Sequence, residues 1–513
     1  MQKRFSFNII FLTFLILTFS GLNNNFLLNS SSEITINSEP LINYIKHVAI
    51  CITHDDNFTD LGFLGIGTAN DPFLIHNLNI TTTANRGIQI YDTTKHFVIS
   101  SCYIESRGYG IDIDTVAAGT VSIINCTISG NIWDGIFIQD TSSIKIINST
   151  IINNFAEGIK LDQSPGAIIT NNTVQNNADN GISLWYSSNT TLIDNTLVND
   201  GVFVYDVSIE NYRNLTMINN SVNGKEIGYF KDTNDLIISN PIYGQLIIIW
   251  CQKVNIFNQI LSNGAIGMFL FYCDYAYIAN NTCNNNVDDG ISLLYSDYAM
   301  IENNTCNNNG DGINLEISSY STIFNNTCID NNFRGVRLLA GYYCEILNNT
   351  ANDSGFIDIY IGLSDDITVT NNTCIGSVYY GIYSQHSSTC IITYNQINEC
   401  NSYGIFLDSN SVNNIIHHNN FTDNNLSGMS QGYDDGTGNV FYDIITLSGN
   451  WWNNWDGSTT YLIAGTANNY DPYPLGIPMI HEFLGSVCTL FILSAICLTS
   501  IYIITVSKRK LRK

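Results

Sequence analysis

An Asn-Asn-Thr triplet returns along this chain at an almost constant interval. Its first residue is Asn280, Asn303, Asn325, Asn348 and then Asn371, so the steps are 23, 22, 23 and 23 residues. A glycine followed by a hydrophobic residue keeps nearly the same interval, with copies at Gly87, Gly110, Gly135, Gly158, Gly181, Gly267, Gly290, Gly312 and Gly335. A fixed period of this size indicates stacked structural units, each of which buries its apolar face only against its neighbours.

One repeat contains three short strand patterns. The segment Gly290–Leu293 alternates apolar and polar residues, a period of two that is typical of a half-buried strand, and further short strands are expected around Ile301 and Cys306. The sequence therefore predicts an all-β fold, a single-stranded parallel β-helix with about 22–23 residues per coil. A leucine-rich repeat would need a different Leu and Asn spacing, and a β-propeller needs about 40 residues per blade.

The repeated asparagines have a structural explanation in such a coil. Copies one coil apart lie about 4.8 Å from each other, so their amides can form a hydrogen-bonded column, and Asn tolerates the left-handed backbone of tight corners. The same triplets match the N-glycosylation pattern. Because the repeat itself generates that pattern, the sequence leaves glycosylation open.

The periodic pattern has limits and one interruption. Residues 24–85 are expected to form an N-terminal lead-in or cap, residues 86–430 the β-helix, and residues 431–480 a C-terminal cap rich in tryptophan. The interval is broken near residues 219–241. Caps are expected because the open ends of a β-helix expose strand edges and core.

Both ends of the chain carry membrane signals. Residues 1–23 resemble a signal peptide, with an uncleaved anchor as the alternative. Residues 483–506 form an uncharged run long enough to span a bilayer, and the basic residues of 507–513 follow it. Because cationic flanks stay on the cytoplasmic side, we expect a single-pass membrane protein with an extracellular body and a short cytoplasmic tail.

The net charge and the positions of the cysteines limit which partners and which core contacts are expected for the body of the chain. The formal net charge of −25 argues against nucleic acid as a partner. Cys283, Cys306, Cys328 and Cys374 each follow an Asn-Asn-Thr triplet, at a position that holds Val174 in an earlier repeat. A position that accepts both residue types is favoured as a small apolar core position, although Cys283 and Cys306 on neighbouring coils could also form a disulfide.

The combination of repeats resembles the right-handed parallel β-helix proteins of the NosD-like group, which carry carbohydrate-binding and sugar-hydrolase type repeats. The resemblance covers roughly residues 87–425, the Ser221–Lys225 interruption and the Gly65–Phe73 segment. It implies a right-handed coil. Relatives include copper-site accessory proteins, polysaccharide lyases and hydrolases, epimerases and surface proteins, so it implies no single activity.

Catalytic motifs are sparse. Pectin-type hydrolases of this fold would be expected to show Asn-Thr-Asp, Asp-Asp, Gly-His-Gly and Arg-Ile-Lys, and only the second occurs, at Asp288-Asp289. His417 and His418 are the only adjacent histidines, and their spacing is not diagnostic of copper. The sequence therefore predicts no catalytic residue and leans against an enzyme.

Two columns are candidates for ligand contact. Carboxylates precede the coil glycines at Asp134, Glu157, Asp289 and Asp311; Asp288, Asp289 and Asp311 could hold calcium, the one cofactor that the pattern suggests, or be solvated corner residues. Tyrosines follow four coil glycines by eight residues, at Tyr275, Tyr298, Tyr320 and Tyr343. These rings could present a stripe to a glycan or a surface protein, or simply stabilise the stack.

The leading functional prediction is a membrane-anchored extracellular β-helix for surface binding, adhesion or envelope structure, with glycans as a candidate ligand. The alternatives are a membrane-tethered polysaccharide lyase or hydrolase and a NosD-like copper-site accessory protein.

Overall fold

The computed structural model describes residues 44–206, 208–425 and 428–479. The predicted signal peptide (1–23), membrane span (483–506) and basic tail (507–513) lie outside these residues. Within the described part of the chain, no helix has the length and apolar character needed to cross a membrane.

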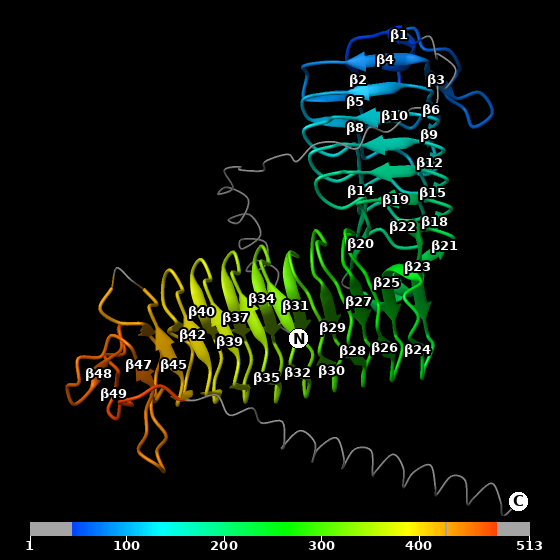
Figure 1. Cartoon of the computed structure of the whole chain (residues 1–513). Coiled ribbons are helices and arrows are strands. Elements are labelled where there is room, and N and C mark those ends of the chain that lie inside the picture. The colour runs from blue at the N-terminus through cyan, green and yellow to red at the C-terminus, as the bar shows by residue number, and fades with distance from the viewer. Residues whose placement is uncertain (1–43, 207, 426–427, 480–513) are drawn as a thin grey trace, which may run out of the picture. The chain divides into compact units, whose positions relative to one another are not determined.

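Parallel strands form a first stack of coils over residues 45–222 (Figure 1). Its front sheet contains β2 (Ile50–Ile52), β5 (Arg86–Tyr91), β8 (Tyr109–Asp114), β11 (Ile136–Gln139), β14 (Ile159–Asp162), β17 (Ile182–Trp185) and β20 (Val202–Tyr205). Its side sheet contains β3 (Phe73–His76), β6 (Phe97–Ser100), β9 (Val121–Ile124), β12 (Lys145–Ile147), β15 (Ile168–Thr170), β18 (Thr191–Ile193) and β21 (Thr216–Ile218). Its back sheet contains β1 (Ile45–Lys46), β4 (Leu78–Thr81), β7 (Tyr103–Glu105), β10 (Thr127–Ser129), β13 (Thr150–Ile152), β16 (Thr173–Gln175), β19 (Thr196–Val198) and β22 (Ser221–Val222).

A second stack follows over residues 225–452. Its front sheet contains β23 (Lys225–Lys231), β25 (Tyr243–Ile249), β27 (Met268–Phe271), β29 (Ile291–Leu294), β31 (Asp311–Glu316), β34 (Arg334–Leu339), β37 (Ile357–Gly362), β40 (Tyr380–Gln385), β43 (Ile405–Leu407) and β46 (Gly432–Asp434). Its side sheet contains β24 (Ile237–Ile238), β26 (Asn255–Phe257), β28 (Tyr277–Ala279), β30 (Met300–Glu302), β32 (Thr322–Phe324), β35 (Glu345–Leu347), β38 (Thr368–Thr370), β41 (Ile391–Thr393) and β44 (Ile415–His417). Its back sheet contains β33 (Thr327–Ile329), β36 (Thr350–Asn352), β39 (Thr373–Ile375), β42 (Gln396–Asn398), β45 (Asn420–Thr422) and β47 (Trp451–Trp452).

The remaining elements are short. The helices are α2 (Asn57–Asp60) and α3 (Ile209–Arg213), and β48 (Tyr461–Leu462) pairs antiparallel with β49 (Tyr470–Asp471). Stacked parallel strands begin at β1, inside the range 24–85 that the sequence assigned to a lead-in or cap, and β46 and β47 continue the stacking into the range 431–480.

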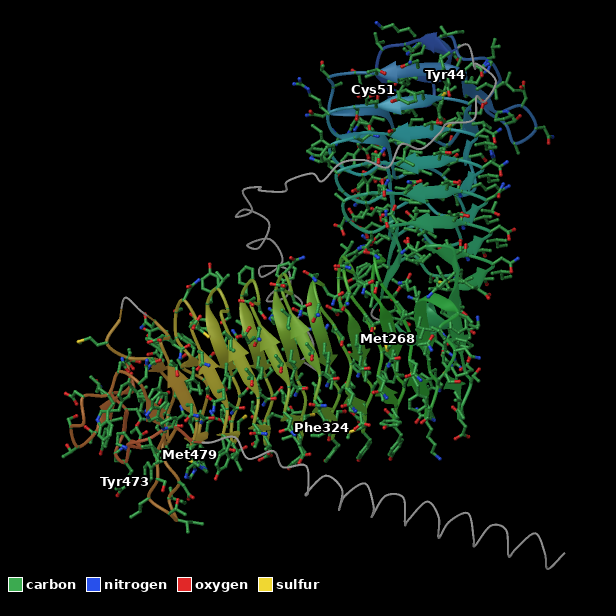
Figure 2. The ribbon with its side chains drawn as sticks, viewed as in Figure 1. Tyr44, Cys51, Met268, Phe324, Tyr473 and Met479 are labelled. Atoms are coloured by element: carbon green, nitrogen blue, oxygen red, sulfur yellow. The ribbon has the colours of Figure 1, made fainter. Side chains whose placement is uncertain are left out.

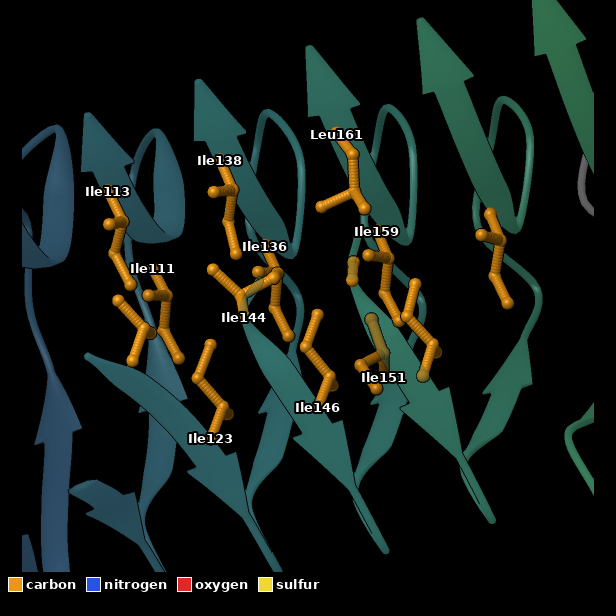
Figure 3. Packing of buried hydrophobic residues seen from close by; sticks show 14 of the residues in the cluster. Ile111, Ile113, Ile123, Ile136, Ile138, Ile144, Ile146, Ile151, Ile159 and Leu161 are labelled. Carbon is orange, nitrogen blue, oxygen red and sulfur yellow. The ribbon is translucent and has the colours of Figure 1, made fainter. Parts of the chain in front are cut away.

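Equivalent residues of successive repeats lie directly beside each other. Ile136 pairs with Ile159 in the front sheet, and Thr150 pairs with Thr173 in the back sheet. Isoleucine is the most frequent inward side chain of the first stack, and the inward residues labelled in Figure 3 are fully buried. The predicted all-β parallel coil with like residues over like is therefore confirmed.

The two asparagines of each triplet have different tasks. The first has a left-handed backbone, with φ between 53° and 62° at Asn280, Asn303, Asn325, Asn348 and Asn371. The second is buried, and its Oδ1 accepts hydrogen bonds from both the main-chain N–H and the Nδ2–H of the asparagine one coil earlier. This asparagine ladder has Nδ2–Oδ1 distances of 2.8–3.0 Å through Asn281, Asn304, Asn326, Asn349, Asn372, Asn395, Asn419 and Asn450.

The coil glycines make room for neighbouring coils. A Cβ atom on Gly290 would lie 2.7 Å from the carbonyl oxygen of Gly312 and 2.9 Å from Nδ2 of Asn309. Both distances are too short for a side chain, which explains why glycine returns with the repeat. The cysteines after the triplets fill the adjacent core: Cys283, Cys306 and Cys328 are fully buried free thiols, as the core interpretation predicts, and the described cysteines form no disulfide.

The first stack ends against the outer face of the second. At the broken interval, β22 pairs with β23 antiparallel. The outward rings Phe269 and Phe271 of β27 are buried in the core cluster of the first stack, and Tyr212 of α3 packs on Phe271 with ring centroids 4.1 Å apart. Met268 marks the start of β27 in Figure 2. The second stack thus covers the open end of the first.

Substitution of a ladder residue should be costly. Asn326→Ala removes the acceptor for the N–H and Nδ2–H of Asn304 and the donor to Asn349 and to the carbonyl oxygen of Ile301. Because buried polar groups would be left unpaired, we expect the free energy of unfolding to fall by about 2–5 kcal/mol in urea denaturation. The control is Asn325→Gly on the exposed corner, where glycine adopts the same backbone; an equal loss in both variants would contradict a stabilising ladder.

A ladder of the first stack ends in a carboxyl group instead of an amide. Asp200 is fully buried and accepts a hydrogen bond from Nδ2 of Asn177 at 2.9 Å. Burial raises the pKa of Asp200 from 3.8 to about 8, so between these values the folded state holds a proton that the unfolded state has lost. Stability contributed by this group is therefore lost as the pH rises through that window, by roughly 1.4 kcal/mol per pH unit.

Asp200→Asn should abolish this dependence. We expect the variant to gain stability over the native chain as the pH rises from 4 to 8, with urea midpoints measured across that range. Asp194→Asn, on the exposed corner of the same coil, is the matched control. If the difference in urea midpoint between Asp200→Asn and the native chain stayed constant over this pH range, Asp200 would be ionised in the folded chain.

Candidate functional site

The four predicted tyrosines form one column on the second stack. The ring centroids of Tyr275, Tyr298, Tyr320 and Tyr343 are 4.8, 5.0 and 5.2 Å apart in turn, with interplanar angles of 6°, 9° and 16°. Each side chain remains about half exposed. Because each inner ring is covered on both faces by its neighbours, this tyrosine column offers a ligand mainly ring edges and hydroxyl groups. Its contact with a ligand stays a prediction.

The three predicted calcium ligands separate into two groups. Asp288 accepts a hydrogen bond from Nδ2 of Asn180 in the first stack at 3.0 Å. Asp289 instead accepts from Nδ2 of Asn314 at 2.8 Å, and Asp311 lies 3.3 Å from Nη1 of Arg334. The structure therefore does not bring the three together around one point. Nowhere among the described residues do three His, Cys, Asp or Glu side chains converge to hold a metal ion.

The carboxyl groups of this region raise one another's pKa. Burial, and then the neighbouring Asp179 and Asp289, raise the pKa of Asp288 well above its usual value. Burial and Asp311 raise the pKa of Asp289 to about 6. Carboxyl groups on adjacent coils therefore disfavour each other's ionisation, and the charge of Arg337 offsets part of this effect at Asp289.

Six aromatic side chains that the sequence analysis did not single out form a patch on the front sheet of the second stack. This aromatic face consists of Tyr360, Tyr380, Tyr383, Tyr403, Phe406 and Tyr433. Five are half-buried, and Tyr360 is buried beneath the guanidinium of Arg334, which lies 4.9 Å from the ring centroid. The Phe406 ring meets Tyr383 edge-on at 5.2 Å and stacks on Tyr433 at 4.6 Å. Unlike the tyrosine column, the patch mixes tilted, edge-on and stacked rings.

A polar groove of about 480 Å³ lies next to this face. It is lined by Asp434, Asp435, Gly436, Thr437, Gly438, Asn439, Thr466, Ala467 and Asn469. Tyr433 connects the two, because its hydroxyl donates to Oδ2 of Asp435 at 3.0 Å. Hydrogen bonds from the backbone and hydroxyl of Thr466 lower the pKa of Asp435, so this carboxylate accepts hydrogen bonds at neutral pH.

The adjacent histidines do not form a copper site with other described residues. Nδ1 of His417 lies 2.5 Å from Nδ1 of His418, and the His418 ring stacks on Tyr394. Burial lowers the pKa of both histidines.

The comparisons with known proteins agree with this geometry. The family model of the right-handed β-helix region matches residues 48–222 and 331–443, more than half of the chain. The chain belongs to this family. Residues 233–365 of the β-helix also match the model of the periplasmic copper-binding protein NosD. No curated protein sequence matches the chain.

Solved structures similar to this β-helix have low identity. They include the periplasmic alginate epimerase AlgG (12% identity, 74% of this chain and 84% of that chain, TM-score 0.30) and the A-module of the Azotobacter vinelandii mannuronan C-5 epimerase AlgE6 (11%, 76% and 98%, 0.26). The Dettilon tailspike protein gp208 is a third (13%, 65% and 60%, 0.23). At these TM-scores the likeness supports no inference about activity.

A sequence signal for the aromatic face was present. Tyr380-Gly381-Ile382-Tyr383 returns 23 residues later as Tyr403-Gly404-Ile405-Phe406. The second residue after the coil glycine is Ser292, Asn314 or Arg337 in earlier repeats, so the residue type at this position changes along the stack. Stacking alone favours the same residue type at equivalent positions of successive coils. The change from polar residues to aromatic residues at this position is the signal that would have indicated a binding surface.

The tyrosine column should contribute measurably to stability. Tyr298→Asn keeps a residue suited to φ of 59° but removes two ring stacks, each worth about 0.5–1.5 kcal/mol. We expect the free energy of unfolding to fall by about 1–3 kcal/mol in urea. Lys253→Asn, on an exposed left-handed corner without a ring, is the control and should change little; equal effects would mean that the rings do not stabilise the stack.

Proposed function

We propose that this β-helix protein binds glycans at the cell surface through the aromatic face and the polar groove. The observation that carries the proposal is the continuity of the two, made by the hydrogen bond from Tyr433 to Asp435. Carbohydrates present apolar C–H faces and hydroxyl donors together. An exposed ring suits the first, and a carboxylate acceptor suits the second.

The aromatic face suits this role better than the tyrosine column does. Phe406 stacks in parallel on Tyr433, but Tyr383 meets its neighbours Tyr360, Tyr380 and Phe406 at steep angles, so no parallel ring covers Tyr383. In the column, Tyr298 and Tyr320 each lie between two parallel rings. We therefore assign the column to the stability of the stack and not to glycan binding.

The extracellular address of the body is part of the proposal. The apolar N-terminal segment and the charge asymmetry around residues 483–506 support export followed by single-pass anchoring. The NosD model, whose description is periplasmic, supports a body outside the cytoplasm. Adhesion or envelope structure would follow if the bound glycan belongs to a neighbouring surface.

One observation favours polysaccharide cleavage as a second candidate. Nδ1 of His386 lies 2.7 Å from Oδ2 of Asp408. Burial, and then the charge of Asp408, raise the pKa of Tyr383. A His–Asp pair beside a sugar-binding surface has the composition of a proton-transfer site. Release of reducing ends or unsaturated products from a bound polysaccharide, lost in His386→Gln, would favour this function over binding alone.

Binding can be tested with the full-length chain in detergent on a glycan array. For the glycans that bind, we expect Tyr383→Ser with Phe406→Ala to weaken binding by tenfold or more, which corresponds to about 1.4 kcal/mol. The comparison variant is Tyr298→Asn in the tyrosine column, which should retain binding once its folding is verified by circular dichroism. Loss of binding in Tyr298→Asn with retention in the double variant would move the site to the column.

A further inference from the structure

Two distant loops meet where the first stack contacts the second. Asn180 precedes the glycine that opens β17, and Asp288 precedes the Asp289-Gly290 pair that opens β29, 108 residues later. Nδ2 of Asn180 donates to Oδ1 of Asp179 at 3.2 Å and to Oδ2 of Asp288 at 3.0 Å. One amide group therefore lies between two carboxyl groups from different stacks.

The surroundings of these loops are strongly acidic. The charged groups facing Asp179 and Asp288 are Glu157, Asp289 and Lys160. Lys160 is already bonded to Glu157, with Nζ 2.9 Å from Oε1. Burial and Glu157 raise the pKa of Asp179 to about 6. The single lysine does not balance the carboxyl groups gathered here.

The amide of Asn180 has an unused oxygen. The residue is only 5% exposed, and its Oδ1 has no hydrogen-bond partner. A buried acceptor without a donor is unfavourable. Rotating the amide by half a turn would place Oδ1 where Nδ2 now lies, within about 3 Å of two carboxylate oxygens. Three oxygens in that arrangement repel one another unless a cation lies between them.

We propose that Asp179, Asn180 and Asp288 bind a divalent cation of the calcium class that joins the two stacks. Calcium accepts a flexible shell of carboxylate and amide oxygens, with water completing it. The site differs from the one suggested by the Asp288, Asp289 and Asp311 pattern, because Asp289 and Asp311 are bonded to Asn314 and Arg334. It is independent of glycan binding at the aromatic face.

Binding at this site should be coupled to proton release. A carboxyl group must lose its proton to coordinate the cation, so affinity should rise with pH. Burial and the surrounding carboxylates hold the pKa of Asp288 well above its usual value, which makes proton release part of binding. A cation held loosely by exposed carboxylates would show no such dependence near neutral pH.

The test uses the full-length chain after chelator treatment, titrated with calcium chloride by isothermal calorimetry and by thermal unfolding. We expect saturable binding, a higher melting temperature and an affinity at least tenfold higher at about pH 8 than at about pH 5. Magnesium should bind more weakly, because it demands a stricter octahedral shell. The absence of any shift up to about 10 mM calcium would overturn the proposal.

Variants separate this site from its neighbours. Asp288→Asn and Asn180→Ala should lose the calcium response while the calcium-free circular dichroism spectrum and urea midpoint report whether the fold is intact. Asp330→Asn, on an exposed corner of the second stack, should keep the response. A response retained in a folded Asp288→Asn variant, or lost in Asp311→Asn and kept in Asp288→Asn, would contradict the assignment.

Discussion

The hydrogen bond from one asparagine side chain to the next coil is the interaction on which the second stack depends. Each amide in the ladder accepts with its oxygen from the preceding coil, as at Asn326 from Asn304. Its nitrogen donates to the next asparagine in the following coil and to a carbonyl oxygen of the preceding coil, as at Asn326 to Asn349 and Ile301. The ladder satisfies buried main-chain N–H groups at a corner where no strand could pair them. It also fixes the register, because a shift by one residue would replace the buried asparagine with the neighbouring corner Asn or Thr and would turn the inward side chains of the strands outward.

Equivalent positions in successive coils form columns of side chains, and some of these columns are repetitive while others vary. Columns that serve stacking hold one residue type over many coils, as the ladder asparagines and inward isoleucines do. The outer face of the front sheet is freed from that requirement, so Asn314, Arg337 and Tyr383 occupy equivalent places. The side-chain chemistry that the proposed glycan binding requires is therefore concentrated where the repeat is least regular.

Most of the fold could be predicted from the sequence, because each coil contacts mainly its neighbours and the period records those contacts. The contact between the two stacks could not be predicted in this way. Tyr212 packs on Phe271, and Asn180 donates to Asp288, but these pairs are not separated by the repeat interval. A local hint existed in Leu246–Ile249, an unbroken apolar run that indicates a strand buried on both faces. The tyrosine column was predicted correctly as a stripe, but ring stacking depends on side-chain geometry that spacing does not reveal. The three calcium candidates separated for a similar reason, because adjacent residues on a corner point to different neighbours.

Hydrogen exchange of individual main-chain amides tests the central claim most directly. If the ladder holds the coils together, the N–H groups of Asn304, Asn326 and Asn349, which donate to ladder oxygens at 2.8–2.9 Å, should be among the slowest to exchange in the second stack. Exchange of these groups as fast as that of amides in exposed loops, under conditions where the chain stays folded, would contradict the account.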